Sequence, residues 1–198
     1  MTYIIIGLIL ISCIAFFSTS CGMKSTERKE LTATQDTIKP KIHKTHENTF
    51  EDLRNTAFKI THKQLGLSLS KDQTIVFGVI MDWEMGGATA TTVTYQTGDA
   101  SLYLSSGGGV IGGGQHQNVN IASKKFVNFA QTFLDKATKI ETTTLPESNE
   151  VIFYFLTNKG IFQGKENIKY FEKNSSKWIK LFEEGNNVLT ELRKVSGE

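Results

Sequence analysis

The sequence has little cysteine, little proline and almost no net charge. Two cysteines in 198 residues can build neither a disulfide framework nor a four-cysteine zinc site. Two prolines exclude a proline-rich linker protein. The 22 basic and 20 acidic side chains leave a formal net charge of +2, which excludes a strongly basic nucleic-acid-binding protein and an acidic disordered tail. The length provides room for one ordinary domain and a short additional segment.

Charged side chains are absent from residues 1–20. Residues 3–17 form a nearly continuous apolar run, which is followed by three small residues and then Cys21. A secretory signal has such an apolar region ending in small residues, whereas a membrane span needs about 20 apolar residues. The pattern predicts a signal peptide over residues 1–20, and an uncleaved membrane anchor is the alternative.

The cysteine after Ser18, Thr19 and Ser20 resembles the lipobox of bacterial lipoproteins, with Ser18 at a position where that family usually has leucine. The resemblance implies that Cys21 receives a diacylglyceryl group and becomes the first residue after cleavage. Acyl chains on this residue would attach the protein stably to a membrane. We therefore expect a lipid-anchored protein of the bacterial cell envelope, with the rest of the chain outside the cytoplasm.

Residues 21–48 have the composition of a flexible tether, because their few apolar residues show neither helical nor strand periodicity. The histidines and the glutamate in this segment (His43, His46 and Glu47) are interpreted as solvated residues rather than as a metal site. A single domain is expected over residues 49–198, and about 150 residues can bury a full core.

Hydrophobic periodicity predicts three helices and five strands in this domain. The helices are expected over residues 50–65, 119–137 and 176–195. The strands are expected over residues 74–83, 88–96, 101–106, 151–157 and 161–164. The order α-β-β-β-α-β-β-α predicts an α+β fold with a mostly antiparallel sheet of about five strands flanked by three helices. This order is similar to that of profilin-like folds, including roadblock and longin domains, a similarity of topology that implies no function.

Six of the 17 glycines fall within residues 107–114. Their spacing matches a dinucleotide fingerprint, but the preceding strand belongs to a hairpin and no acidic residue follows about 20 positions later, so no nucleotide cofactor is expected. Two interpretations stay open: a loop that needs glycine for positive φ, and a site where backbone N–H groups and polar side chains capture an anion. The candidate ligand-binding residues are Ser105, Ser106, Gly107, Gly108, Gly109, Gly112, Gly113, Gly114, Gln115 and His116.

Two carboxylates, Asp82 and Glu84, are separated by one residue in a predicted strand and should point to the same side, with Trp83 on the other. Such a pair can perform acid–base chemistry or hold a cation, but no third ligand is spaced to join it, so solvated charges at a strand end are the favoured interpretation. A nucleophile set could also be assembled from Ser105 or Ser106, His116 and Asp82. These serines lack the Gly-x-Ser-x-Gly motif of a nucleophile elbow. No metal site is expected.

These observations favour a non-catalytic, lipid-anchored extracytoplasmic domain that binds a protein partner or an envelope component. The glycine-rich segment and the turn at residues 82–87 are the expected contact surfaces. The alternative is a domain that binds a small ligand or an anion at residues 105–116. A weak hydrolase activity at the same residues is one form of this alternative. Neither hypothesis needs a cofactor or a nucleic-acid partner.

Overall fold

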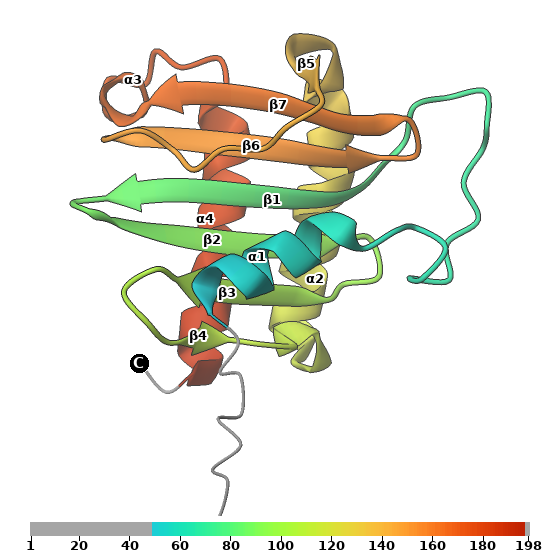
Figure 1. Ribbon diagram of the computed structural model, residues 1–198, viewed down its shortest axis with the longest axis horizontal. Coiled ribbons are helices and arrows are strands. Elements are labelled where there is room, and N and C mark those ends of the chain that lie inside the picture. Colours follow the sequence, from blue (N-terminus) through green and yellow to red (C-terminus); the bar gives the residue numbers. More distant parts are fainter. Residues whose placement is uncertain (1–48, 197–198) are drawn as a thin grey trace, which may run out of the picture. The chain divides into compact units, whose positions relative to one another are not determined.

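An antiparallel sheet of seven strands organises residues 49–196, the part of the chain that the computed structural model describes (Figure 1). The predicted signal peptide, the predicted lipidation site at Cys21 and the predicted tether lie outside these residues. No helix within residues 49–196 is both long and apolar enough to cross a membrane.

The strand order in the sheet is β4-β3-β2-β1-β6-β7-β5, and every neighbouring pair runs antiparallel. The meander β1–β4 therefore meets the group of β5, β6 and β7 at the centre, where β1 pairs with β6. The strands are β1 (Val76–Met85), β2 (Ala88–Tyr95), β3 (Ala100–Leu104), β4 (Gly109–Val110), β5 (Thr138–Ile140), β6 (Glu150–Thr157) and β7 (Gly160–Asn167).

Helices cover both faces of the sheet. One face is covered by α2 and α4, which also pack against each other, and α1 crosses the opposite face (Figure 1). The α-helices are α1 (Phe50–Lys59), α2 (Gln117–Ala130), α3 (Ile168–Glu172) and α4 (Ile179–Ser196). Two 3₁₀ turns, Gly113–Gln115 and Gln131–Lys136, flank α2.

The predicted α+β class and antiparallel sheet are confirmed, but the numbers of strands and helices were wrong. The sheet has seven strands rather than about five, because the short segments β4 and β5 pair with β3 and β7. The described residues form four α-helices rather than three. The additional one, α3, is a five-residue helix whose first turn is capped by the side chain of Asn167.

Two apolar cores form, one on each face of the sheet. The larger core lies under α2 and α4 and contains the fully buried side chains of Phe126, Phe153 and Trp178. The smaller core lies under α1 and contains Ile80 and Tyr154. The strands β1 and β6 contribute to both cores, in agreement with their continuous apolar sequences.

The first helix starts where the sequence predicts but ends earlier. Thr49 and Asp52 form a reciprocal capping box, with the Thr49 side chain accepting from the Asp52 N–H and the Asp52 side chain accepting from the Thr49 N–H. The helix ends at Lys59 because Ile60 has an extended backbone, with φ of −64° and ψ of 129°. The following residues, predicted to be helical, form turns instead.

Gly185 lies in α4 where this helix approaches β1 and α2. A Cβ atom at this position would stand 2.6 Å from Met81 Sδ and 3.2 Å from Phe126 Cζ. The close approach explains why glycine, which costs about 1 kcal/mol relative to alanine in a helix, occupies this position.

Gly185→Ala should lower the free energy of unfolding by about 1–3 kcal/mol, because overpacking outweighs the gain in helix propensity. Asn187→Ala, at an exposed position of the same helix, should change stability by no more than about 0.5 kcal/mol. Urea unfolding of residues 22–198 measures both effects. An unchanged stability for Gly185→Ala would show that the Met81 side chain moves aside without cost.

Candidate functional site

A buried ion pair joins α1 to the centre of the sheet. Arg54 Nε and Nη2 donate to Asp82 Oδ2 at 2.9 and 2.6 Å, and Thr91 Oγ1 donates to Asp82 Oδ1 at 2.6 Å. Arg54 Nη2 also donates to the carbonyl oxygen of Thr144 at 2.7 Å. Arg54 is 5% exposed and Asp82 is fully buried, so the pair is shielded from water.

Aromatic side chains complete the attachment of α1. The Arg54 guanidinium carbon lies 4.8 Å from the ring centroid of Phe58 and 5.7 Å from that of Tyr154, within cation–π range. The hydroxyl of Tyr95 donates to the carbonyl oxygen of Ala57 at 3.0 Å. Both halves of the helix are therefore fixed against the sheet.

Burial raises the pKa of the Asp82 carboxyl above its ordinary value, and the charge of Arg54 and hydrogen bonds from Arg54 and Thr91 oppose that rise. Without Arg54, Asp82 would become a buried charge with no counter-charge or would bind a proton. The sequence predicted a solvated charge at a strand end, and the burial of Asp82 corrects that interpretation.

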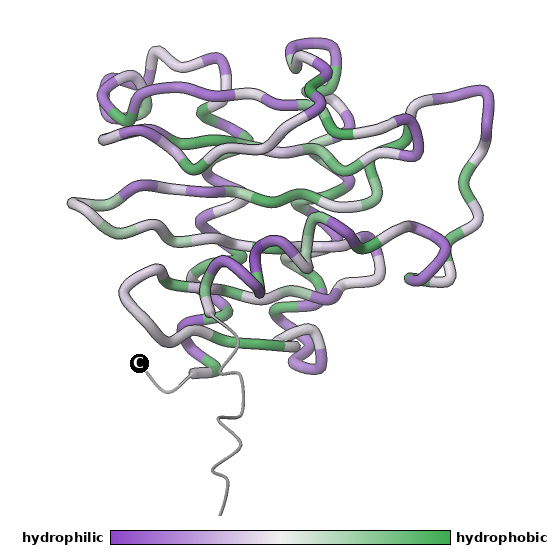
Figure 2. The backbone as a smooth tube through the Cα atoms, viewed as in Figure 1, coloured by the Kyte–Doolittle hydropathy of each residue, from purple (hydrophilic) through white to green (hydrophobic). Residues whose placement is uncertain are grey.

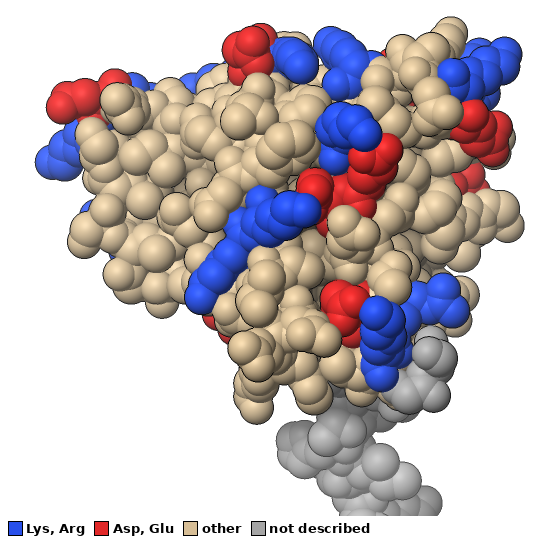
Figure 3. All heavy atoms as spheres, turned by 180° about the vertical axis from the view of Figure 1, so that it is seen from behind, with Lys and Arg blue, Asp and Glu red and all other residues tan. Residues whose placement is uncertain are grey.

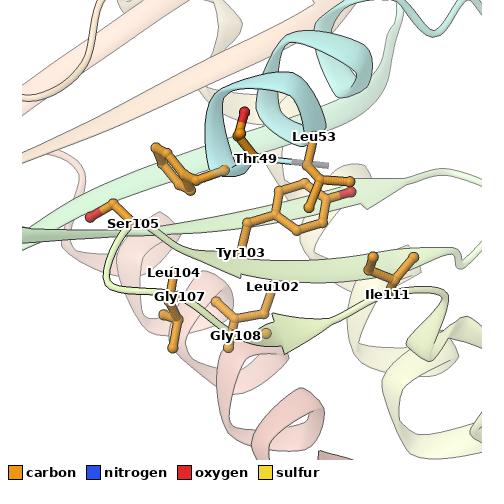
Figure 4. Close-up of a pocket in the computed structure, with 11 residues that line it drawn as sticks. Thr49, Leu53, Leu102, Tyr103, Leu104, Ser105, Gly107, Gly108 and Ile111 are labelled. Carbon is orange, nitrogen blue, oxygen red and sulfur yellow. The ribbon is translucent and has the colours of Figure 1, made fainter. Parts of the chain in front are cut away.

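The first turn of α1 forms one wall of a cleft, and the β3–β4 hairpin forms the other (Figure 4). The cleft has a volume of about 590 Å³, which lies within the range of small-molecule sites. Most of its side chains are apolar, with hydroxyl groups from Thr49, Tyr103 and Ser105. The lining residues are Thr49, Phe50, Leu53, Leu102, Tyr103, Leu104, Ser105, Gly107, Gly108, Gly109 and Ile111.

Two residues of the glycine-rich segment lie open to the cleft. Gly107 and Gly108 have φ values of 102° and 83°, and no atom lies within 4 Å of the place where a Cβ atom would stand. Glycine adopts this left-handed backbone without strain, so the hairpin can turn tightly here. The tip of the hairpin therefore offers backbone rather than side chains to the cleft.

The other end of the segment is packed into the fold. Gly109 pairs with Tyr103, and a Cβ atom on it would lie 2.1 Å from the Leu102 carbonyl oxygen. A Cβ atom on Gly113 would lie 2.4 Å from Leu192 Cδ2. A Cβ atom on Gly114 would lie 2.6 Å from the Gly98 carbonyl oxygen. These glycines satisfy packing, and the antiparallel pairing of β3 excludes a βαβ unit around them.

Other candidate residues lie away from the cleft. His116, with Gln117 and Asn118, lines a shallower hollow of about 270 Å³ between the start of α2 and the end of α4. The ion pair of Lys194 and Glu191 also contributes to this lining. The anion hypothesis expected a pocket at the start of the second long helix, whereas the larger cleft opens at the start of the first.

The turn at residues 82–87 and the glycine hairpin lie at the same end of the sheet (Figure 1). Ser105 N donates to the Thr89 carbonyl oxygen at 2.9 Å, and Thr89 N donates to Ser105 Oγ at 2.8 Å. Ser106 is exposed at the hairpin tip. The two surfaces expected to contact a partner are therefore neighbours.

The carboxylates Asp82 and Glu84 have separate partners. Whereas Asp82 is buried against Arg54, the Glu84 carboxylate accepts hydrogen bonds from the N–H groups of Asn149 and Gly87, which lower its pKa. Trp83 points to the side of the sheet opposite Asp82, as predicted, and packs against the larger core. Within residues 49–196, no group of three or more His, Cys, Asp or Glu side chains could hold a metal ion.

The hypothetical nucleophile set is not assembled. Gly112 N donates to Ser101 Oγ, so the chain leading to His116 leaves the sheet beside residue 101. Ser105, just past the end of β3, lies four residues farther along the chain, which corresponds to about 13 Å of extended backbone. The third member, Asp82, is occupied by Arg54.

The sequence reasoning missed Arg54 and the apolar lining of the cleft. A signal for Arg54 was present, because it lies among the apolar positions of α1 (residues 50, 53 and 57) that face the sheet. A charge in such a stripe needs a buried partner. The sequence around Leu102 and Tyr103 contains no comparable signal, because it has the pattern of an ordinary strand in a β-hairpin.

Comparisons with known proteins add no relative. No protein-family model matches the chain, and no curated protein or solved structure is significantly similar to it. The similarity to profilin-like topologies therefore stays a prediction. The fold and the cleft describe the molecule as an α+β domain with an open, mainly apolar cleft.

Arg54→Met should lower the free energy of unfolding by about 3–5 kcal/mol, because Asp82 would be left without its counter-charge. Adding Asp82→Asn should recover part of this loss, since no buried charge then remains. Lys59→Met, at an exposed position of the same helix, should change stability by about 0.5 kcal/mol or less. Denaturant unfolding of these three variants and of Asp82→Asn alone forms the test, and simple addition of the effects of Arg54→Met and Asp82→Asn would contradict coupling.

Proposed function

We propose that this chain is a non-catalytic binding domain, lipid-anchored outside the cytoplasm, which binds a protein partner or an envelope component in the cleft between α1 and the β3–β4 hairpin. The cleft itself is the observation that supports this function most directly. It is open, has a volume of about 590 Å³ and carries apolar side chains on both walls. Apolar walls favour an apolar contact from the ligand or partner.

The surroundings of the cleft favour binding over catalysis. The hydroxyl of Ser105 already accepts a hydrogen bond from the Thr89 N–H, and no histidine lines the cleft. Asp82, the carboxylate of the hypothetical nucleophile set, is paired with Arg54. The site thus offers shape and apolar surface rather than an activated nucleophile.

One exposed apolar side chain lines the cleft, and a second lies at the turn between β1 and β2. Ile111 lines the cleft and is 69% exposed, and Met85 at the neighbouring turn is 43% exposed. Large exposed apolar side chains near a cleft are typical of interaction surfaces. A partner that covers both would remove them from water together.

Ile111→Lys should reduce recovery of the partner after crosslinking in intact envelopes by about tenfold or more, because burying an isoleucine contributes about 1.5–3 kcal/mol. Ile121→Lys is the matched control, since Ile121 is 57% exposed on α2, outside the cleft. Equal recovery with Ile111→Lys and the unchanged chain would place the binding surface elsewhere. Lysine at Ile111 or Ile121 tests binding more directly than alanine at Gly109 or Gly113, where the added Cβ atom would collide with neighbouring atoms of the domain.

A small organic ligand in the same cleft is the second candidate, favoured by the volume and by the three hydroxyl groups in the lining. The two candidates differ in what crosslinking captures. A protein partner gives a discrete product of higher mass, whereas a small ligand gives none.

The proposed anchor depends on Cys21. Cys21→Ser should abolish acylation and move most of the protein from the membrane fraction to the soluble fraction, because the acyl chains provide the attachment. Metabolic labelling with a fatty acid and membrane fractionation measure the two effects. Ser20→Ala, which keeps a small residue before the cysteine, should remain acylated. A membrane fraction unchanged by Cys21→Ser would contradict the lipoprotein proposal and favour an uncleaved anchor.

A further inference from the structure

Two adjoining hollows lie at the C-terminal end of α1, and we propose that together they bind an anionic amphiphile, a molecule with one apolar chain and one phosphate or carboxylate headgroup. This site is separate from the cleft at the start of α1, and the inference does not rest on the partner proposed there.

The first hollow is basic. It has a volume of about 480 Å³ and is lined by side chains from three segments of the chain, including Lys63, Lys71 and Lys159. No acidic side chain belongs to this lining. In Figure 2 the long connection between α1 and β1 contains two hydrophilic stretches, residues 62–64 and 71–73, which carry two of these lysines. Several ammonium groups around one hollow favour an anion.

These lysines lack the carboxylate partners that several lysines on the opposite side of the molecule have. Within residues 49–196, Lys63, Lys71 and Lys159 form no salt bridge. On the face formed by α2 and α4, charges of both signs are interspersed (Figure 3), and ion pairs such as Lys125–Glu184 and Lys180–Glu183 form. Among the described residues, none of the three ammonium groups around the hollow is paired with a carboxylate within 4.0 Å.

Hydrogen bonds fix the hollow in shape. Asn158, in the β6–β7 turn, donates to the carbonyl oxygens of Ser70 and Gln73 at 2.7 and 2.9 Å and accepts from Ile75 N at 2.9 Å. Lys159 Nζ donates to the Asp72 carbonyl oxygen at 3.2 Å. The loop that carries Lys71 is thus held against the turn that carries Lys159, and little ordering is needed when a ligand binds.

The second hollow is largely apolar. It has a volume of about 400 Å³, and its apolar lining comes from Phe58, Ile60, Phe77, Leu156 and Ile161. The basic side chains Lys59 and Lys63 stand among these residues. An apolar chain could bury its methylene groups here, at about 0.8 kcal/mol for each group in transfer free energy.

The two hollows share part of their lining. His62, Lys63 and Asn158 belong to both, so an anionic group in the first and an apolar chain in the second can belong to one molecule. His62 Nδ1 lies 3.0 Å from the Leu67 carbonyl oxygen, which can only accept, so this nitrogen carries the proton and the ring is held in place. The arrangement matches an amphiphile better than it matches a free inorganic anion.

Octyl phosphate, at concentrations where it is monomeric, is the probe. Added to residues 22–198, it should shift the amide NMR signals of residues 58–71 and 156–161. Inorganic phosphate and octanol should each bind at least about tenfold more weakly, because each lacks one of the two parts that the hollows contact.

The double variant Lys63→Gln/Lys71→Gln should weaken octyl phosphate binding by about tenfold or more, through loss of charge-assisted contacts. The control is Lys124→Gln/Lys173→Gln. It changes the net charge equally, and both of its lysines are exposed, without a salt bridge among the described residues. Affinity in this control should stay within about twofold of the unchanged chain.

Four outcomes would overturn the proposal. No binding of octyl phosphate removes it directly. Equal binding of inorganic phosphate shows an anion site without a chain site, and equal binding of octanol shows the reverse. An equal loss of affinity in the control variant shows attraction to net charge alone. None of these outcomes bears on the cleft at the start of α1, whose test uses different residues.

Discussion

The buried ion pair of Arg54 and Asp82 sets the position of α1, and both candidate binding sites depend on that position. The helix has only ten residues, and an isolated helix of this length is marginal in water, so tertiary contacts must hold it. A buried ion pair often stabilises a fold no better than apolar side chains of equal volume. What it supplies here is specificity, because a helix shifted by one turn would leave a carboxylate buried without a partner. The cleft opens at the first turn of the helix, and the basic hollow lies beyond the last.

The two faces of the sheet are covered by helices to different extents. Helices α2 and α4 cover one face completely enough to form the larger core, with Trp178 and Phe153 at its centre. Among residues 49–196, α1 is the only helix on the other face, and hollows remain in the surface at each of its ends. The face under α2 and α4 holds the larger core, and the face under α1 holds both sites at which we propose that other molecules bind. Rigid elements thus position loops and turns whose own sequences carry no catalytic pattern.

The sequence predicted the central elements well, because their patterns are long. The continuous apolar runs of β1 and β6 and the stripe of α2 are strong local signals. Both strands were found within two residues of their expected ranges, whereas α2 starts two residues before its expected range and changes after Ala130 into the 3₁₀ turn Gln131–Lys136. The missed elements, β4, β5 and α3, have two, three and five residues, too few to show any period. Gly109 also lacks a side chain, so its strand pairing leaves no trace in hydrophobicity. Asp82 was interpreted from its own strand alone, and its burial depends on Arg54, 28 positions earlier. Likewise, Lys63, Lys71 and Lys159 line one hollow only because the β6–β7 turn holds the loop between α1 and β1 in place.

The short outer strands have a consequence for many copies of this domain at one surface. A sheet of seven strands has two free edges, and exposed edges invite pairing between molecules. Here the outermost strands β4 and β5 offer only two and three residues of backbone. Neither of these two strands is long enough to nucleate a continuous ladder between neighbours. For a domain tethered at a membrane, as proposed, crowding in two dimensions would raise the encounter rate of copies without turning their sheets into an aggregate.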